Sequence, residues 1–155
     1  MLTGFVLIAG TMPVYAQPSR GIGGSKPRLD VGYIQDDASF DGAGCSLWFR
    51  ADKIYTNGRN IFVSDYNEHA LMHVDGRDTP LALVKSYEPD GEVKKGLRST
   101  YIYRGDGIDV VIKYVVVGVC APDDESCEVT QMDAVVSVTA RRGKARFRAH
   151  GICGT

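Results

Sequence analysis

Two histidines four positions apart, His69 and His73, are the residues whose spacing most directly suggests chemistry. On a helix, both imidazoles would lie on one face and could hold a zinc ion. The zinc-protease motif needs a Glu after the first His, however, and here Glu68 precedes it. The apolar alternation over Ala70–Val74 predicts a strand instead, which would separate the two histidines by about 13 Å. We therefore expect solvent-facing strand histidines and no metal site.

A cluster of cations near the C-terminus is the best candidate for a binding site. It consists of Arg141, Arg142, Lys144, Arg146 and Arg148. Arg146 and Arg148 alternate with apolar residues, so they would point the same way from one strand. Such a row suits an anionic glycan, a phosphate-rich polymer or an acidic partner. It equally suits a solvated strand face whose charges block edge-to-edge aggregation, and the sequence leaves both interpretations open.

The other chemistry-bearing residues give weaker signals. The acidic run Asp123–Glu125 lacks the spacing and the Gly of a calcium loop, which favours a solvated loop. Ser46, Ser64 and His150 are loose candidates for nucleophilic catalysis, but the chain contains no G-x-S-x-G motif. We therefore predict no catalytic residue, no metal and no cofactor.

The chain contains four cysteines, and their positions predict two disulfides. Cys45 and Cys153 each fall on the apolar face of an alternating segment, so a bond between them would tie the first strand of the body to the last. Cys120 and Cys127 flank a short loop and can meet across its neck. No C-x-x-C spacing indicates a zinc site. With all four sulfurs paired, a thiol nucleophile is not expected.

Short alternating segments separated by Gly-containing turns indicate an all-β fold. We expect about eight short strands in a disulfide-stapled antiparallel barrel or sandwich. The segment Ile108–Cys120 is the most apolar part of the body and is rich in β-branched residues, which predicts the central strand. No segment shows a helical period over helical length.

The register between this central strand and the segment after Cys127 can be predicted from burial. If Cys120 lay directly opposite Cys127, Tyr114 would face Asp133. Shifting the register by one residue places apolar residues opposite each other, and register follows burial. The pairs are then Val110 with Val138, Ile112 with Val136, Tyr114 with Ala134 and Val116 with Met132. This register requires a bulge or an irregular neck at the cysteines.

The N-terminal part divides into two predicted regions that precede a β-domain over residues 43–155. Residues 1–16 are typical of a signal peptide, with an apolar run too short for a membrane span and small residues before Gln17. Residues 17–42 are rich in Gly, Pro and Ser and predict a flexible linker with a short strand at Leu29–Ile34. Export and paired cysteines together predict a secreted or periplasmic protein, without a transmembrane segment after cleavage.

The overall plan resembles small exported bacterial β-proteins, among them the periplasmic lysozyme inhibitors of the membrane-bound type. The features that carry the resemblance are the leader, the spacer, the Asp75-Gly76 hairpin dipeptide and the closing Cys153. That family's inhibitory Ser and Lys match no residue here, so the resemblance assigns no site.

The leading hypothesis is a non-enzymatic binding or structural domain. Its expected ligand is an anionic envelope polymer or a protein, held at the basic hairpin. The formal net charge of -1 gives no overall attraction to nucleic acid, so no nucleic-acid partner is expected. An inhibitor of a secreted hydrolase such as lysozyme, and a small hydrolase whose residues meet only in the fold, are the alternatives.

Overall fold

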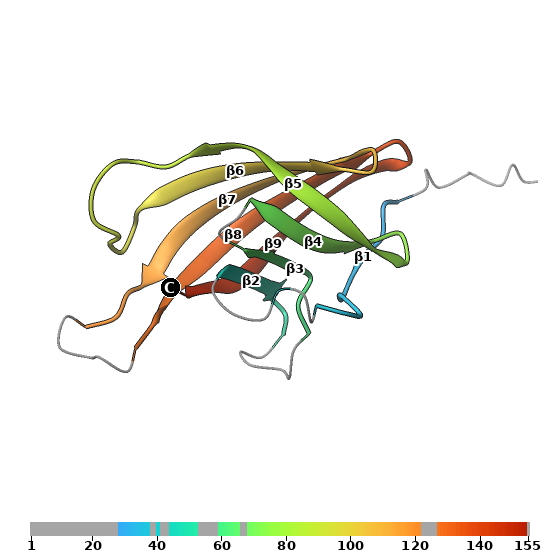
Figure 1. Cartoon of the computed structure of the whole chain (residues 1–155). Helices are drawn as coiled ribbons and strands as arrows, with labels where there is room; N and C mark the ends of the chain where they lie inside the picture. The colour runs from blue at the N-terminus through green and yellow to red at the C-terminus, as the bar shows by residue number, and fades with distance from the viewer. Residues whose placement is uncertain are drawn as a thin grey trace, which may run out of the picture.

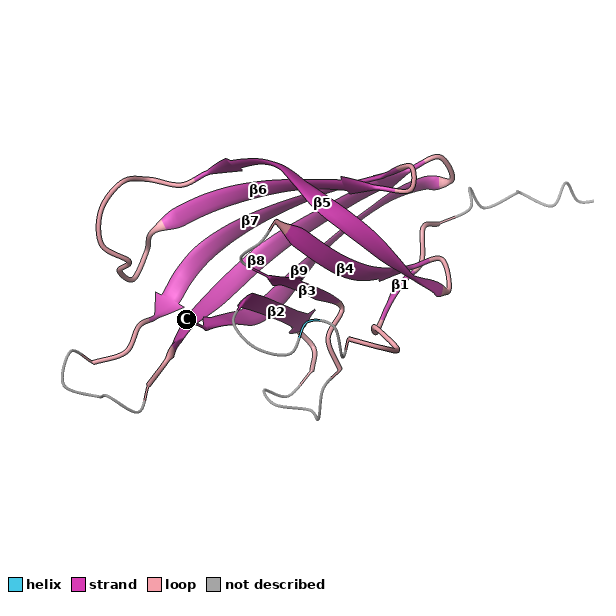
Figure 2. Ribbon diagram, in the orientation of Figure 1, coloured by secondary structure: helices cyan, strands magenta, loops and turns pink. Residues whose placement is uncertain are grey.

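The chain is all-β in the computed structural model, which describes residues 28–37, 40, 44–52, 59–65, 68–121 and 127–154. These residues form nine strands and no α-helix (Figure 2). The strands are β1 Val31–Gly32, β2 Gly44–Phe49, β3 Phe62–Asp65, β4 His69–Val74, β5 Arg77–Tyr87, β6 Arg98–Gly105, β7 Ile108–Gly118, β8 Val129–Ala140 and β9 Gly143–Gly154. The predicted signal peptide and the acidic run Asp123–Glu125 lie outside the described residues.

Strands β2 to β9 close into an eight-stranded antiparallel barrel (Figure 1). Each strand pairs with the next along the chain, and β9 returns to pair with β2. This confirms the predicted antiparallel all-β class and decides between the two architectures left open by the sequence. Within the described residues, no helix is long and apolar enough to cross a bilayer.

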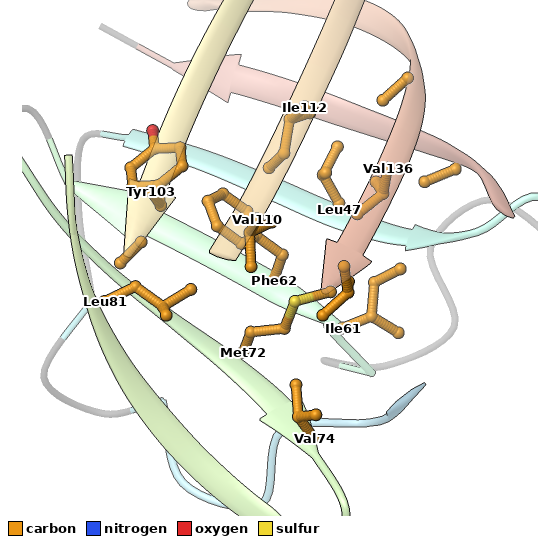
Figure 3. Close-up of a cluster of buried hydrophobic side chains, with 14 of the residues drawn as sticks. Leu47, Ile61, Phe62, Met72, Val74, Leu81, Tyr103, Val110, Ile112 and Val136 are labelled. Carbon is orange, nitrogen blue, oxygen red and sulfur yellow. The ribbon is translucent and has the colours of Figure 1, made fainter. Parts of the chain in front are cut away.

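Inward-facing side chains fill the barrel, as expected for a barrel of this strand number. Leu47, Phe62 and Ile112 are fully buried and come from three different strands (Figure 3). The alternation that the sequence showed is therefore the alternation between barrel interior and outer surface. Burial of several such side chains, at about 2 kcal/mol each, is the main source of stability.

Both predicted disulfides are present, and the predicted register is correct. Cys45 lies opposite Cys153 across the pairing of β2 with β9, and the two are bonded. Cys120 and Cys127 are bonded across the loop between β7 and β8. In that hairpin Ile112 faces Val136, and the register shifts between Val116 and Gly118, where a bulge was expected.

The described segment before the barrel packs closely against it, and β1 lies within the short strand predicted at Leu29–Ile34. Leu29 is only 4% exposed and joins the barrel core, while β1 pairs with β4. Ile34 joins Val63 and Leu71 in a second apolar cluster on the outer side of β3 and β4. These few apolar residues, each of which meets an apolar strand face, hold the segment against the barrel.

Candidate functional site

The predicted basic cluster is divided by the structure into two parts. Arg141 and Arg142 lie in the turn between β8 and β9, at one end of the barrel. A pocket there is lined by both arginines together with Asp75 and Asp106. Arg142 Nη1 is 3.9 Å from Asp75 Oδ2, and Arg77 pairs with Asp106. The charge at this tip is thus partly neutralised by acids.

Lys144, Arg146 and Arg148 form the second part and project outward from β9. All three are exposed, whereas the alternating Ala145 and Phe147 pack against the core. None of the three cations has an ion-pair partner among the residues that the structure describes. The alternation predicted from the sequence is therefore present, and these charges are available to a ligand.

The strand pairing extends this row with cations from other strands. Arg148 lies opposite Val135 of β8, which lies opposite Lys113 of β7. Residues directly opposite each other share a face of the sheet. Arg50, just after β2, donates its backbone N–H to the Arg148 carbonyl. We name the outward set the basic wall, and its members are Arg50, Arg98, Lys113, Lys144, Arg146 and Arg148.

Sequence reasoning missed half of the basic wall. Arg50, Arg98 and Lys113 are isolated cations in the sequence, and only the barrel places Arg50 next to β9 and brings the outward faces of β6 and β7 onto the same surface. The signal that could have found them is the alternation of inward and outward residues along each strand. Lys113, for example, lies between Ile112 and Tyr114, which both face the core, so it had to face outward.

Acids on the same outer surface are already paired. At the outward positions of β6 to β9 in the described chain, the acids are Asp109 and Asp133. Asp109 Oδ1 accepts a hydrogen bond of 2.6 Å from Arg104 Nε. Asp133 Oδ1 is 2.6 Å from His150 Nδ1. Asp109 is thus balanced by the cation Arg104, and Asp133 is the other outward acid of these described strands, against the six cations of the wall. The wall is therefore locally positive although the whole chain has a net charge of -1.

Shallow apolar hollows lie between the cations. One of about 210 Å³ has Val115 and Val135 in its lining, with Arg50, Lys113 and Arg148 around them. A smaller one of about 120 Å³ is lined mainly by apolar groups of Trp48, Val117 and Ile152, beside His150. The wall thus offers both charge and apolar contact area.

His73 is buried, which corrects the prediction that both histidines face solvent. It is only 8% exposed, and its Nδ1 is 2.6 Å from Asp78 Oδ1. The other oxygen, Asp78 Oδ2, accepts backbone N–H bonds from Gln35 and Asp36 at 2.9 and 3.0 Å. Burial alone would raise the pKa of Asp78, but the bonds from His73 and the two amides outweigh it and lower that pKa. The packed N-terminal segment is what hides the ring.

The other histidine of the suspected metal pair, His69, is exposed, and its Nδ1 lies 3.2 Å from Asp65 Oδ2. The two histidines therefore interact with different aspartates. Among the residues described, no three His, Cys, Asp or Glu side chains are grouped closely enough to hold a metal ion. The i, i+4 spacing of the two histidines reflects one face of β4.

The candidate nucleophiles are not arranged for hydrolysis in the described part of the chain. Ser64 is buried beside Tyr103 inside the barrel, and Ser46 lies opposite Val63. No Ser or Thr hydroxyl there hydrogen-bonds to the imidazole of His73 or His150. Burial raises the pKa of Tyr103 to about 12, so its phenol stays neutral at ordinary pH.

Comparisons of the chain with protein-family models, with curated proteins and with solved structures found no match. The class of the molecule therefore rests on its own geometry. It is a disulfide-linked, eight-stranded antiparallel barrel with one additional short strand, and it carries a basic outer surface. The two disulfides are typical of proteins from oxidising compartments.

Proposed function

We propose that the chain is a non-enzymatic binding domain, secreted or periplasmic, whose basic wall holds an anionic polymer of the cell envelope. The observation that carries this proposal is the collection of exposed, unpaired cations on neighbouring strands, where both outward acids are already occupied. The wall attracts negative charge locally, and the net charge of the chain does not oppose this strongly.

The spacing of the cations favours a polymer over a compact anion. Outward residues two positions apart on one strand are separated by about 7 Å, and residues two strands apart by about 10 Å. Arg146 and Arg148 illustrate the first spacing, Arg148 and Lys113 the second. A site for a single phosphate would need several hydrogen-bond donors directed at one point. A chain with one charge per repeat unit can instead contact several cations in succession, and its apolar parts can cover Val115 and Val135.

The location proposed for the protein rests on two features that support each other. The sequence begins with a segment typical of a signal peptide, and all four cysteines form disulfides. Disulfides persist in secreted and periplasmic proteins and are rare in reducing compartments. An envelope polymer would be accessible to the protein in either of these locations.

Charge reversal on the wall tests this function. Heparin and dextran sulfate serve as anionic probes, neutral dextran as the uncharged control, and titration calorimetry measures the affinity. The double variant Arg146→Glu with Arg148→Glu should weaken binding about ten-fold or more. The matched control, Arg141→Glu with Arg142→Glu, makes the same charge change at the turn and should weaken it only about two-fold.

Salt provides the second arm of this test. Affinity for both probes should fall steeply between about 50 mM and 500 mM salt, because exposed charges are screened over that range. Binding that is insensitive to salt, or that survives reversal of Arg146 and Arg148, would exclude the wall as the polymer site. Equal losses for the two double variants would show only a general effect of net charge.

An inhibitor of a secreted hydrolase is the second candidate. The loop between β5 and β6 extends from the barrel (Figure 1); Tyr87, the last residue of β5, is 52% exposed, and Val93 in the loop is 55% exposed. Exposed apolar side chains on a protruding loop suit insertion into an enzyme cleft. If this function holds, the protein inhibits at least one member of a lysozyme and protease panel, and Val93→Asp weakens that inhibition. No inhibition across the panel would remove this candidate.

A further inference from the structure

The barrel wall has one unfilled strand position at the end near β1. Both β1 and β3 pair with the same edge of β4, because β5 occupies the other edge throughout. Strand β3 covers Ala70 to Met72 and β1 covers His73 and Val74. Next to β3 the order continues through β2 to β9, whereas no described strand lies between β1 and β9. Within the described residues, no continuation of β2 fills the barrel at this end.

The edge of β9 facing this position carries unpaired backbone groups. Strand β2 pairs with β9 only as far as Ala149, and the last bond runs from Arg50 N–H to the Arg148 carbonyl. Successive residues of a strand direct their backbone groups to opposite sides. Arg146 and Lys144 therefore direct their N–H and C=O groups toward the unfilled position, where the described chain supplies no partner.

The opposite side of the position is also an open edge. Asp75 N–H donates to the Asp30 carbonyl, so the backbone groups of Asp30 point toward β4. Those of Val31 point away from β4, toward β9. A groove of about 470 Å³ lies between these edges and is lined by Arg28 to Val31, Phe49 and Ala145 to Phe147. Figure 1 shows β1, in blue, at the same end of the barrel as the turn between β8 and β9.

We propose that this groove binds an extended acidic segment of a partner protein, which adds a strand to the edge of β9. Strand addition of this kind obtains affinity from backbone hydrogen bonds and specificity from alternate side chains. The site differs from the polymer site on the basic wall, although the two sites share the side chain of Arg146, whose backbone belongs to the groove alone.

The surroundings define which side chains the partner would present. Ala145 and Phe147 face inward beside Leu29, so partner residues on that side would be apolar. Partner residues opposite Arg146 and Lys144 would face outward, because paired residues share a face. There they meet these two cations and Arg28, against a single acid, Asp30. The pattern expected is a strict alternation of acidic and apolar residues.

Two synthetic peptides of the same composition test the pattern on the intact protein. One alternates Glu and Val, and the other places its Glu residues first and its Val residues after them. The alternating peptide should bind, and it should protect the backbone amides of Lys144 and Arg146 from hydrogen exchange. The block peptide and an alternating Lys–Val peptide should not. Equal binding of the two Glu–Val peptides would overturn the proposal.

The variant Arg146→Pro tests the backbone bond itself. Proline lacks an N–H, but edge strands tolerate it, and the N–H lost here points away from β8. Its matched control, Arg146→Ala, removes the same charge and keeps the N–H. The Pro variant should bind the alternating peptide roughly two- to ten-fold more weakly than the Ala variant. Equal affinities of the two variants would overturn strand addition.

Methylated peptides give the same test without changing the protein. Methylation of the peptide nitrogens that face β9 should abolish binding, while methylation of the alternate nitrogens, which face the short edge at Val31, should weaken it less. If both sets of methyl groups have the same effect, no strand is added.

A further variant separates the two proposed sites. Arg98→Ala should weaken heparin binding and leave the peptide affinity unchanged, so failure of the wall and failure of the groove can be told apart. Self-association of the protein that blocks the peptide would assign the groove to a second copy and overturn the proposal.

Discussion

Two histidine–aspartate pairs in this barrel have the same geometry and different surroundings. In both His73–Asp78 and His150–Asp133, Nδ1 and Oδ1 are 2.6 Å apart. The side chains of the first pair are 10% and 19% exposed, and those of the second are 28% and 38% exposed. The distance alone therefore says little about what each pair contributes.

The difference lies in the other groups that each carboxylate serves. Asp78 also accepts the amides of Gln35 and Asp36, and so holds the N-terminal segment against the β4–β5 hairpin. The ring it orients fits closely, since a Cβ on Gly32 would be 2.8 Å from His73 Cδ2. Beside the basic wall, Asp133 instead places one negative charge among exposed cations. The first pair is a structural clamp, and the second adjusts a surface potential.

The largest effect is expected from Asp78→Asn. An amide has a single acceptor oxygen and cannot serve both the imidazole of buried His73 and the two backbone N–H groups, so at least one donor loses its partner. We expect a loss of about 2–3 kcal/mol in the free energy of unfolding, measured with denaturant. Faster hydrogen exchange at Gln35 and Asp36 should accompany it. A loss under about 0.5 kcal/mol would show that the clamp contributes little.

Acid should reproduce much of that loss in the unmodified protein. The pKa of Asp78 in the folded protein is lowered from its ordinary value of 3.8, so ionisation favours folding. The contribution is complete above about pH 4 and is lost as the pH falls through the lowered folded pKa. The stability gap between the protein and Asp78→Asn should therefore narrow below pH 3.8. A gap that stays constant down to about pH 2 would contradict this assignment.

The variant Thr79→Val, next to Asp78, tests how much a buried hydroxyl group costs in stability. Thr79 is 1% exposed, and its Oγ1 has no hydrogen-bond partner within the described structure. Val has almost the same shape and no hydroxyl. Because a buried hydroxyl without a partner is costly, we expect stability to rise by about 1 kcal/mol in thermal or chemical unfolding. A loss of stability would mean that the hydroxyl has a partner.

The smallest change in stability is expected from Asp133→Asn. Partly exposed ion pairs contribute about 0–1 kcal/mol, so unfolding should shift by about 0.5 kcal/mol or less. The wall would gain a net positive charge, however, and heparin should bind about two-fold more tightly. A large loss of stability here would remove the distinction between the two pairs.

The parts of the fold predicted correctly from the sequence are those governed by two-residue alternation. The assignment of residues to the inner face of each strand was enough to pair Cys45 with Cys153 and to place Ile112 opposite Val136. The predicted bond joined the first strand of the body to the last, but closure into a barrel was not predictable, because it also depends on the tilt and register of all the strands. Those relations join residues that no local pattern connects.

The candidate site was predicted only in part, for the same reason. Arg146 and Arg148 share a strand and were found together, whereas Arg50 and Lys113 become their neighbours only through the barrel. His73 was assigned to the surface because its covering segment looks like a linker. The residues of β4 were assigned to the correct faces of the strand. Alternation separates the two faces, however, and does not show what covers each of them.

The pairing of β2 with β9 also has a consequence for how the polypeptide is assembled. Every other barrel pairing joins neighbouring strands and can form as soon as a hairpin has been synthesised. Cys153 lies 108 residues after Cys45, in the last strand of the barrel. A chain emerging from a ribosome or a translocation pore must wait for β9 before this seam can close. Until then β2 presents an open edge, and a chaperone or an oxidase would have its best opportunity to act there.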